Sequence, residues 1–176
     1  MKKKTSSVTL GLIIAFILVA ISVILYIAVS DFKQQQKFGY FTFVVLIGGI
    51  VYACITNSKE NNGNVTFGNL FSFGFKTSAV IACIMVIYTA LSLTILFPEM
   101  KEKGLEQARE QMETQGKLSE SQIDDAISMT DKIMLPLAIG GSLVMYLIIG
   151  AISSLIGAAI AKKNPNPTPF ESDSLS

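Results

Sequence analysis

Four long segments without a charged side chain are the feature that most limits how this chain can fold. They are residues 8–29, 38–57, 77–97 and 133–161, and none contains Asp, Glu, Lys or Arg. As a helix, the first would be about 33 Å long, which matches the hydrocarbon core of a bilayer. Each segment is apolar on all sides, as expected for a helix surrounded by lipid. The sequence therefore predicts an all-α integral membrane four-helix bundle, formed by a single domain of residues 1–163.

The composition agrees with a membrane protein and excludes several classes of function. Hydrophobic residues make up 51% of the chain and charged residues 15%, whereas soluble domains are usually about 25% charged. The chain has no histidine, which removes His-based metal sites, catalytic triads and imidazole proton relays. Its net charge of +1 predicts no nucleic-acid partner. We expect no enzymatic activity, no cofactor and no metal.

The distribution of lysines predicts the orientation in the membrane. One side would hold seven lysines crowded at the ends of the spans: Lys2, Lys3, Lys4, Lys59, Lys76, Lys162 and Lys163. The other side also has seven basic residues, but five of them are diluted in the loop 98–132 among nine acidic residues. Because cytoplasmic loops carry clustered lysines, both termini are predicted in the cytoplasm. The first span is too long for a secretory signal and lacks a good cleavage site, so it is interpreted as uncleaved.

The segment before the third span allows two interpretations. Thr66 is a plausible N-cap, and after it apolar residues recur at helical spacing: Phe67, Leu70, Phe71, Gly74 and Phe75. The stripe suits a short helix lying at the cytoplasmic interface, with Lys76 extending toward the headgroups. It equally suits a third span that simply begins early.

The loop of residues 98–132 is predicted to form two extracytoplasmic helices. The first would run from Glu99 to Gln115 and end at Gly116. Ser119 and Gln122 form a capping-box pattern for the second, with Ser121 as the alternative cap. Pro136 should kink or break the junction with the fourth span. The proline-rich tail, residues 164–176, is predicted to be a disordered cytoplasmic segment.

Two tyrosines are predicted near the middle of the membrane. Tyr88 would lie about 17 Å into the third span, and Tyr146 about 15 Å into the fourth. A phenol at that depth needs a partner, and Ser22, Thr89 and Ser92 are candidates, as is a contact between the tyrosines. The pair would either line a path for a substrate or form hydrogen bonds between helices, and the second role is favoured. Cys54 and Cys83 lie in apolar runs and are both predicted to be buried thiols.

Small residues predict where the helices approach closely. The fourth span carries rows of them at intervals of four, and the second carries a pair; the residues singled out are Gly48, Gly49, Gly150, Ser153, Ser154 and Gly157. Such rows bring helix backbones together inside a membrane. Packing within one chain is favoured over a dimer interface, but both stay open.

Several motifs give the chain a resemblance to a known family. These are a Gly-x-Val-Thr-Phe-Gly stretch before the third span, a proline after it, an acidic helix, and a closing stretch rich in small residues. The matching positions are Gly63–Gly68, Gly74, Pro98, Ser119–Ala126, Pro136 and Gly150–Lys163. The chain resembles the bacterial family labelled "domain of unknown function 4199". The resemblance implies a small bacterial inner-membrane protein of four spans, and it supplies no activity.

Three classes of function remain after these exclusions. The favoured class is a non-catalytic scaffold or accessory subunit, whose partners besides the lipid bilayer would be a second copy or an unidentified membrane protein. The alternative is a small transporter or channel for a neutral solute, because the spans lack the ionisable residues of ion-coupled carriers. A membrane enzyme is least favoured, because no nucleophile–base pair is visible.

Overall fold

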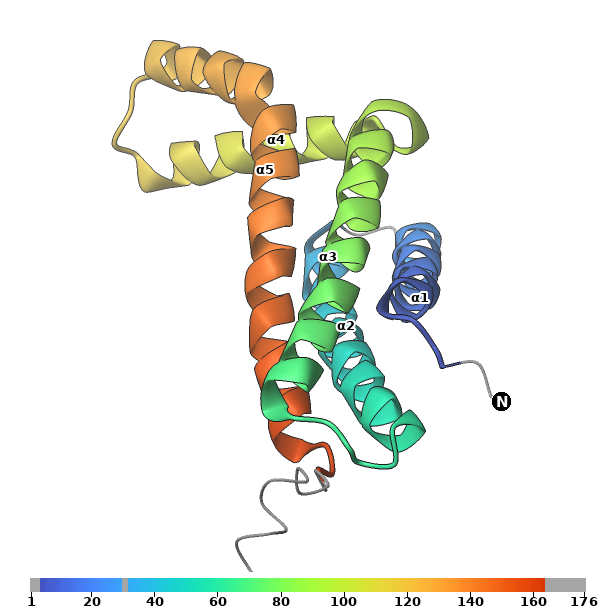
Figure 1. Cartoon of the computed structure of the whole chain (residues 1–176). Coiled ribbons are helices and arrows are strands. Elements are labelled where there is room, and N and C mark those ends of the chain that lie inside the picture. Colours follow the sequence, from blue (N-terminus) through green and yellow to red (C-terminus); the bar gives the residue numbers. More distant parts are fainter. Residues whose placement is uncertain (1–3, 30–31, 164–176) are drawn as a thin grey trace, which may run out of the picture.

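The computed structural model describes residues 4–29 and 32–163, and within these ranges the chain is helical with no β-strand (Figure 1). The predicted disordered tail, residues 164–176, lies outside the described residues. Five α-helices and one π-helical turn follow one another: α1 (Ser7–Ala28), α2 (Phe32–Glu60), α3 (Phe67–Leu91), η1 (Ser92–Leu96), α4 (Glu99–Gln115) and α5 (Glu120–Ile160).

Helix ends occur where side chains can satisfy the free backbone groups. Thr66 caps α3, because its hydroxyl accepts a hydrogen bond from the Asn69 amide, 3.2 Å away. Ser119 and Gln122 form the predicted capping box at the start of α5. Gly116 ends α4 in the left-handed region, at φ 61°, which glycine adopts without strain. These three predicted boundaries are confirmed.

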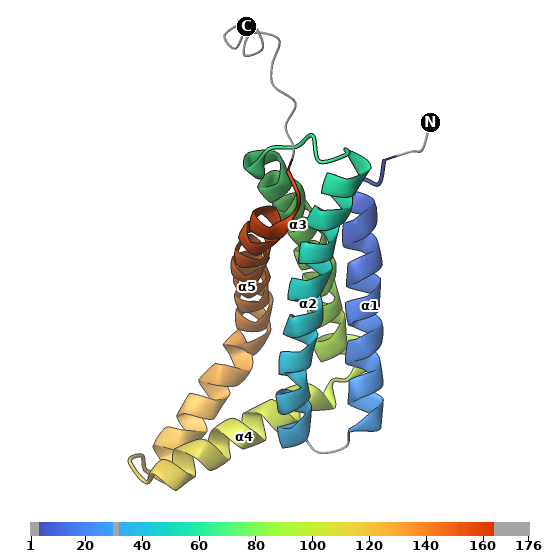
Figure 2. The same ribbon diagram turned by 90° about the horizontal axis from the view of Figure 1, so that it is seen from below.

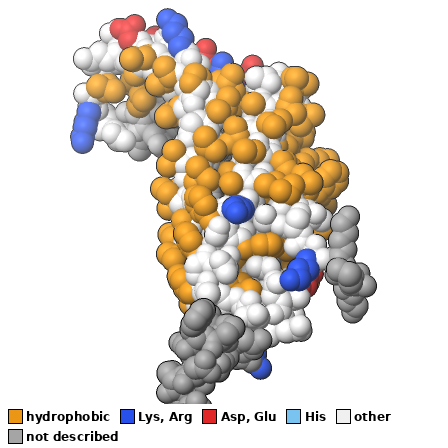
Figure 3. All heavy atoms as spheres, in the orientation of Figure 1, with side chains coloured by type: hydrophobic (Ala, Val, Ile, Leu, Met, Phe, Trp, Pro, Cys, Tyr) orange, Lys and Arg blue, Asp and Glu red, His pale blue; other side chains and the backbone are white. Residues whose placement is uncertain are grey.

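Four of the helices are long and apolar enough to cross a membrane, namely α1, α2 from Lys37, α3 continued through η1, and α5. Their outward-facing side chains are themselves large and apolar; Phe16 is 81% exposed and Ile27 74%. Figure 3 shows this hydrophobic coat, with acidic side chains gathered mainly at one end. A coat of this kind is stable only against lipid, so the molecule is a multi-pass membrane protein.

The four spans form an antiparallel bundle with α2 and α3 at its centre (Figure 2). Helices α2 and α3 each contact all three other spans, and the most extensive packing is that of α3 on α5. A cluster of fully buried aliphatic side chains holds α1, α2 and α3 together: Leu18, Leu46, Ile50, Ile81 and Met85, with Ile14 and Ala15. Inside a membrane this cluster acts through close packing, because lipid tails are as apolar as leucine.

Both ends of the described chain lie at one end of the bundle. The Thr5 amide donates to a Glu60 carboxylate oxygen at 2.8 Å, and the Ser58 hydroxyl donates to the Lys162 carbonyl. The connection between α2 and α3 is therefore near the beginning of α1 and the end of α5. Helix α4 lies at the opposite end (Figure 2). We call the end of the bundle that holds both ends of the described chain the terminal end, and the end that holds α4 the hairpin end.

The third span begins early, so the interfacial-helix interpretation is wrong. Helix α3 starts at Phe67 and runs without interruption into the membrane segment. Leu70 and Gly74 from the predicted stripe are buried against the bundle, and Lys76 points outward. Leu70 and Gly74 therefore belong to a packing face of α3, whereas Phe67 and Phe75 of the same stripe are 44% and 37% exposed.

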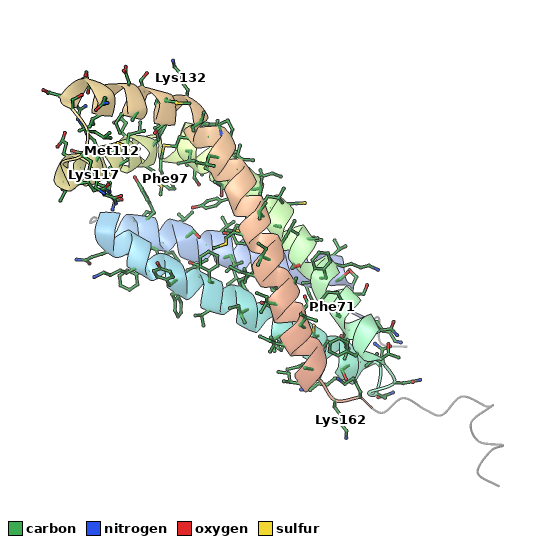
Figure 4. All side chains as sticks on the ribbon, turned by 90° about the vertical axis from the view of Figure 1, so that its left-hand side faces the viewer. Phe71, Phe97, Met112, Lys117, Lys132 and Lys162 are labelled. Atoms are coloured by element: carbon green, nitrogen blue, oxygen red, sulfur yellow. The ribbon has the colours of Figure 1, made fainter. Side chains whose placement is uncertain are left out.

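Pro136 does not break the fourth span, because it lies inside α5, a single helix of 41 residues. The helix changes direction just beyond Lys132 (Figure 4), as expected where a proline removes a backbone hydrogen bond. The first three turns of α5 thereby leave the bundle and lie against α4. We call α4 and this part of α5 the hairpin.

Candidate functional site

The rows of small residues on α5 face α2 and α3 of the same chain. A Cβ added at Gly150 would lie 2.4 Å from both Cβ and Oγ of Ser78, and one at Gly157 would lie 2.9 Å from Cβ of Cys54. Gly74 of α3 is equally close to Ser154 and Cys54. We call these six residues the small-residue interface. At this interface the backbone of α5 lies close to those of α2 and α3, with no room for an added Cβ.

Serines in this region satisfy their hydroxyls within their own helix. Ser153 donates to the Ile149 carbonyl and Ser154 to the Gly150 carbonyl, each at 2.6 Å, and both side chains are fully buried. Ser78 does the same with the Phe75 carbonyl. Hydroxyls bonded in this way act as small packing groups and leave no polar atom free for a ligand.

The two predicted glycines of α2 differ in their surroundings. A Cβ at Gly49 would lie 3.0 Å from Ile14 of α1, so this glycine lets α1 and α2 approach closely. A Cβ at Gly48 would meet no atom within 4 Å, and the residue is exposed on the outer surface. Gly48 therefore contributes no close helix contact among the residues described.

Tyr88 and Tyr146 both pack against the aliphatic cluster, but they differ in what else they contact. The Tyr146 ring lies 6.3 Å from that of Phe43, on the side of α5 that faces α2. Tyr88 instead lines a cavity between α1, α2 and α3. Two of its predicted partners, Ser22 and Thr89, donate to the carbonyls of Leu18 and Met85 in their own helices. The third, Ser92, lines the same cavity.

This cavity has a volume of about 260 Å³ and lies at the hairpin end of the bundle. We call it the hairpin-end cavity. Every membrane span except α5 contributes to its wall, and Met100 of α4 closes one side. The lining residues are Ser22, Leu25, Tyr26, Gly39, Thr42, Tyr88, Thr89, Ser92, Leu93 and Met100. None of these side chains is charged, and most of the lining surface is apolar.

The wall formed by α3 changes from α-helical to π-helical at the cavity. Residues Ser92–Leu96 form one π-helical turn, closed by the Phe97 amide donating to the Ser92 carbonyl at 2.9 Å. Single π-turns in helices occur frequently at functional sites. Ser92 is 6% exposed, and its hydroxyl is the one buried side-chain oxygen or nitrogen without a hydrogen-bond partner in the described ranges.

A contact between α1 and the start of α4 lies beside the cavity. The Tyr26 hydroxyl donates to a Glu99 carboxylate oxygen, and the Tyr26 ring packs on Phe97 with 3.8 Å between ring centres. The hydrogen bond from Tyr26 holds the pKa of the Glu99 carboxyl below its usual value of 4.5. This contact ties the hairpin to the bundle.

The hairpin is held by ion pairs between its two arms. Arg109 of α4 pairs with Asp124 of α5 at 2.5 Å, and Lys101 pairs with Asp131 at 2.7 Å. The hydrogen bonds that Arg109 donates to the Glu113 and Asp124 carboxylates raise the pKa of its guanidinium. Ile123 is buried between the arms, and Met112 and Lys117 lie toward the tip (Figure 4). Asp124 and Asp131 therefore stabilise the hairpin itself.

Four of the lining residues were named from the sequence, as a tyrosine and its candidate hydrogen-bond partners. They are Ser22 of the first span and Tyr88, Thr89 and Ser92 of the third. The sequence did not indicate a cavity. Sequence reasoning missed Tyr26, because a tyrosine near a span end is typical of an aromatic belt. It also missed Gly39 and Thr42, since only the packing of α2 against α1 and α3 brings them to the same space.

Four apolar helices, an outward hydrophobic coat and a charged hairpin at one end of the bundle define a multi-pass helical membrane protein. The particular family follows from comparison with known sequences. The model of the family described as "Protein of unknown function (DUF4199)" matches residues 9–163, and the chain belongs to this family. No curated protein and no solved structure matches the chain.

Proposed function

We propose that this protein is a non-catalytic accessory subunit of the bacterial inner membrane, which binds a membrane-protein partner through its hairpin. The observation that carries the proposal is that the hairpin leaves the bundle and is stabilised by its own ion pairs. The start of α4 packs on the spans through Glu99 and Met100, whereas the rest of the hairpin extends away from them and can present a surface to a second protein.

The charge of the hairpin defines the partner's chemistry. The segment of residues 98–132 carries nine acidic and five basic residues, and its net charge is −4. Glu102 and Glu106 are exposed on α4. Large exposed side chains also occur there, with Met129 66% and Leu118 42% exposed. This surface suits a partner whose extracytoplasmic side is basic and partly apolar.

The proposal places both termini in the cytoplasm and the hairpin outside it. The lysines at the terminal end support this orientation, because clustered basic residues are retained on the cytoplasmic side. Reporter fusions at Ser176 and inserted after Gly116 test it: the two tags should be active in different compartments. Activity of both tags in one compartment would reject the orientation.

Partner binding is tested with a photo-crosslinking residue placed at Gln111, which is exposed on α4. In intact cells we expect one discrete adduct with a second membrane protein. The matched control carries the same residue at Gly48, exposed on α2 within the membrane, where only lipid adducts are expected.

Charge reversal sharpens the same experiment. Glu102→Lys combined with Glu106→Lys should reduce the adduct at least fivefold, whereas Glu102→Gln with Glu106→Gln should reduce it less, because neutral side chains do not repel a basic partner. An adduct of equal yield in both double variants would contradict a charge-guided interface. A crosslink only between copies of the chain would replace the heterologous partner by a homo-oligomer.

Transport of a neutral solute is the second candidate, and the hairpin-end cavity favours it. The way onward from the cavity is filled by the aliphatic cluster, in which Leu18, Leu46 and Ile81 are at most 1% exposed. A carrier would have to open this cluster during its cycle. Uptake of neutral solutes into liposomes, lost in Tyr88→Phe and kept in Tyr146→Phe, would support transport over the accessory role.

A further inference from the structure

One buried hydroxyl at the hairpin-end cavity lacks the hydrogen bond that the other buried hydroxyls of the described residues make. Six serine or threonine side chains are buried in the described residues, and five of them donate to backbone carbonyls: Ser58, Thr77, Ser78, Ser153 and Ser154. The sixth, Ser92, has no partner. An unpaired buried hydroxyl costs on the order of 1–3 kcal/mol, so its retention requires an explanation.

The position of Ser92 supplies one. The residue begins the π-helical turn and lines the cavity, so its hydroxyl is available to a molecule that enters this space. We propose that the hairpin-end cavity binds a small neutral amphiphile, an alkyl chain ending in a hydroxyl or carbonyl group that hydrogen-bonds to Ser92. The proposal is independent of the partner-binding role, because the cavity lies among the spans and not on the outer surface of the hairpin.

The lining sets the chemical class of this ligand. No charged side chain contributes to the wall, so an ion would enter without a counter-charge. Leu25, Leu93 and Met100 supply apolar contacts for a hydrocarbon. The polar groups of the wall are hydroxyls, and three of them are already bonded: Ser22 and Thr89 donate to carbonyls of their own helices, and Tyr26 donates to Glu99. Thr42, Tyr88 and Ser92 supply the other hydroxyls, and of these Ser92 is the buried oxygen without a partner in the described ranges. One polar group on an otherwise apolar ligand matches that single oxygen.

The volume sets the ligand's size. An apolar cavity of about 150 Å³ accommodates benzene. On the same scale, the 260 Å³ of the hairpin-end cavity hold roughly ten non-hydrogen atoms. A medium-chain alcohol such as 1-decanol therefore fits, whereas a two-chain phospholipid is several times too large. The bilayer would be the route by which such a ligand reaches the site.

The experiment uses the full chain in nanodiscs of phosphatidylethanolamine and phosphatidylglycerol, with a decanol that carries a photoreactive diazirine in its chain. Labelled peptides are identified by mass spectrometry. We expect labelling in the segment from Tyr88 to Leu93, reduced at least fivefold by excess 1-decanol and less than twofold by excess decane. Equal competition by the alkane would show that the cavity takes any hydrocarbon tail, and would overturn hydroxyl recognition.

Two glycines of α2 provide a matched pair of variants. A Cβ at either Gly39 or Gly48 meets no atom within 4 Å, so both positions accept a side chain at its first carbon. Gly39 lines the cavity and Gly48 does not. Gly39→Leu should fill the space and reduce labelling at least fivefold, whereas Gly48→Leu should label like the unaltered protein. Equal labelling of the two variants would place the probe outside the cavity.

Ser92→Ala tests the hydrogen bond without changing the shape of the wall. The variant loses one oxygen atom and should still take up the probe's alkyl chain. Its preference for 1-decanol over decane as competitor should fall from at least 2.5-fold to about onefold. A preference that survives in Ser92→Ala would reject Ser92 as the recognising group, even if Gly39→Leu behaves as expected.

Discussion

The two ends of the bundle solve the problem of packing helices in lipid in opposite ways. At the small-residue interface, glycine and serine let α5 approach α2 and α3 until a single added carbon would collide. At the hairpin end, α1, α2 and α3 diverge around a cavity of about 260 Å³. The same helices, α2 and α3, take part in both arrangements.

This difference separates residues that hold the fold from residues that are available to a ligand. Close backbone approach yields many van der Waals contacts, which are the main source of helix association in a membrane. A cavity loses those contacts and lowers stability. The close-packed region therefore stabilises the bundle, and the hairpin-end cavity persists at a cost in stability that binding a ligand would offset.

Gly150→Leu should produce the largest effect, because it forces a side chain into the space occupied by Ser78. We expect a loss of about 3 kcal/mol, the upper range for overpacking, or a fall of roughly 6–12 °C in melting temperature. Thermal unfolding in detergent measures it. Gly140→Leu on the same helix is the control, since its Cβ meets no atom within 4 Å.

A pair of smaller changes tests the same contact. Gly150→Ala adds only a Cβ, which would strike the Cβ and Oγ of Ser78 and lower stability. Ser78→Gly removes both of those atoms, so adding it to Gly150→Ala should restore part of the lost stability. If Gly150→Leu melted within 2 °C of the unaltered protein, the close approach of α3 and α5 would be wrong.

Gly39→Leu makes the same chemical change at the opposite end and should have the opposite sign. Leucine has a better helix propensity than glycine, by about 0.5–1 kcal/mol, and here it also gains contacts within the cavity. We expect the melting temperature to rise by about 1–4 °C. A clear decrease would mean that the cavity is narrower than described.

The sequence predicted the framework of this comparison but not its details. Absence of charge identified four spans, and capping residues marked three helix ends at Thr66, Gly116 and Ser119. Hydropathy does not distinguish a helix face that contacts protein from one that contacts lipid, so burial was not predicted correctly for every apolar residue. Cys83, predicted to be buried, is exposed on the outside of α3, whereas Cys54 is buried.

The candidate site was harder to predict for the same physical reason. Lipid and the bundle interior are equally apolar, so Gly48 and Gly49 look alike in the sequence although only Gly49 meets a neighbouring helix. The cavity requires knowledge of how α1, α2 and α3 diverge, which depends on the π-turn at Ser92 and on the contact between Tyr26 and Glu99. Neither feature has a pattern of its own in the sequence.

Ser92→Ala and Ser154→Ala compare a free hydroxyl with a bonded one. Ser92→Ala removes a buried oxygen that has no partner, so the ligand-free protein should gain about 1 kcal/mol, the lower end of the cost of an unpaired hydroxyl. Ser154→Ala removes a hydroxyl that donates to the Gly150 carbonyl and should lose up to about 1 kcal/mol. Denaturation of both variants in the same detergent gives the difference. Equal changes of the same sign would mean that the Ser92 hydroxyl is satisfied in the membrane.

Tyr26→Phe should have the smallest effect and shows how the hairpin end is closed. The ring and its contact with Phe97 remain, while the hydrogen bond to Glu99 is lost, so the Glu99 pKa should return toward 4.5.

Because this bond lowers the pKa of Glu99 in the folded state, its contribution to stability is present above about pH 4.5 and disappears as the pH falls through the lowered value. The unaltered protein should therefore lose more stability than Tyr26→Phe between pH 6 and pH 3. The two proteins differ only in the Tyr26 hydroxyl, so the difference between the two unfolding curves reports on its bond to Glu99. Identical curves, or an unchanged Glu99 titration followed by carbon NMR, would mean that the hairpin is tied to α1 by ring packing alone.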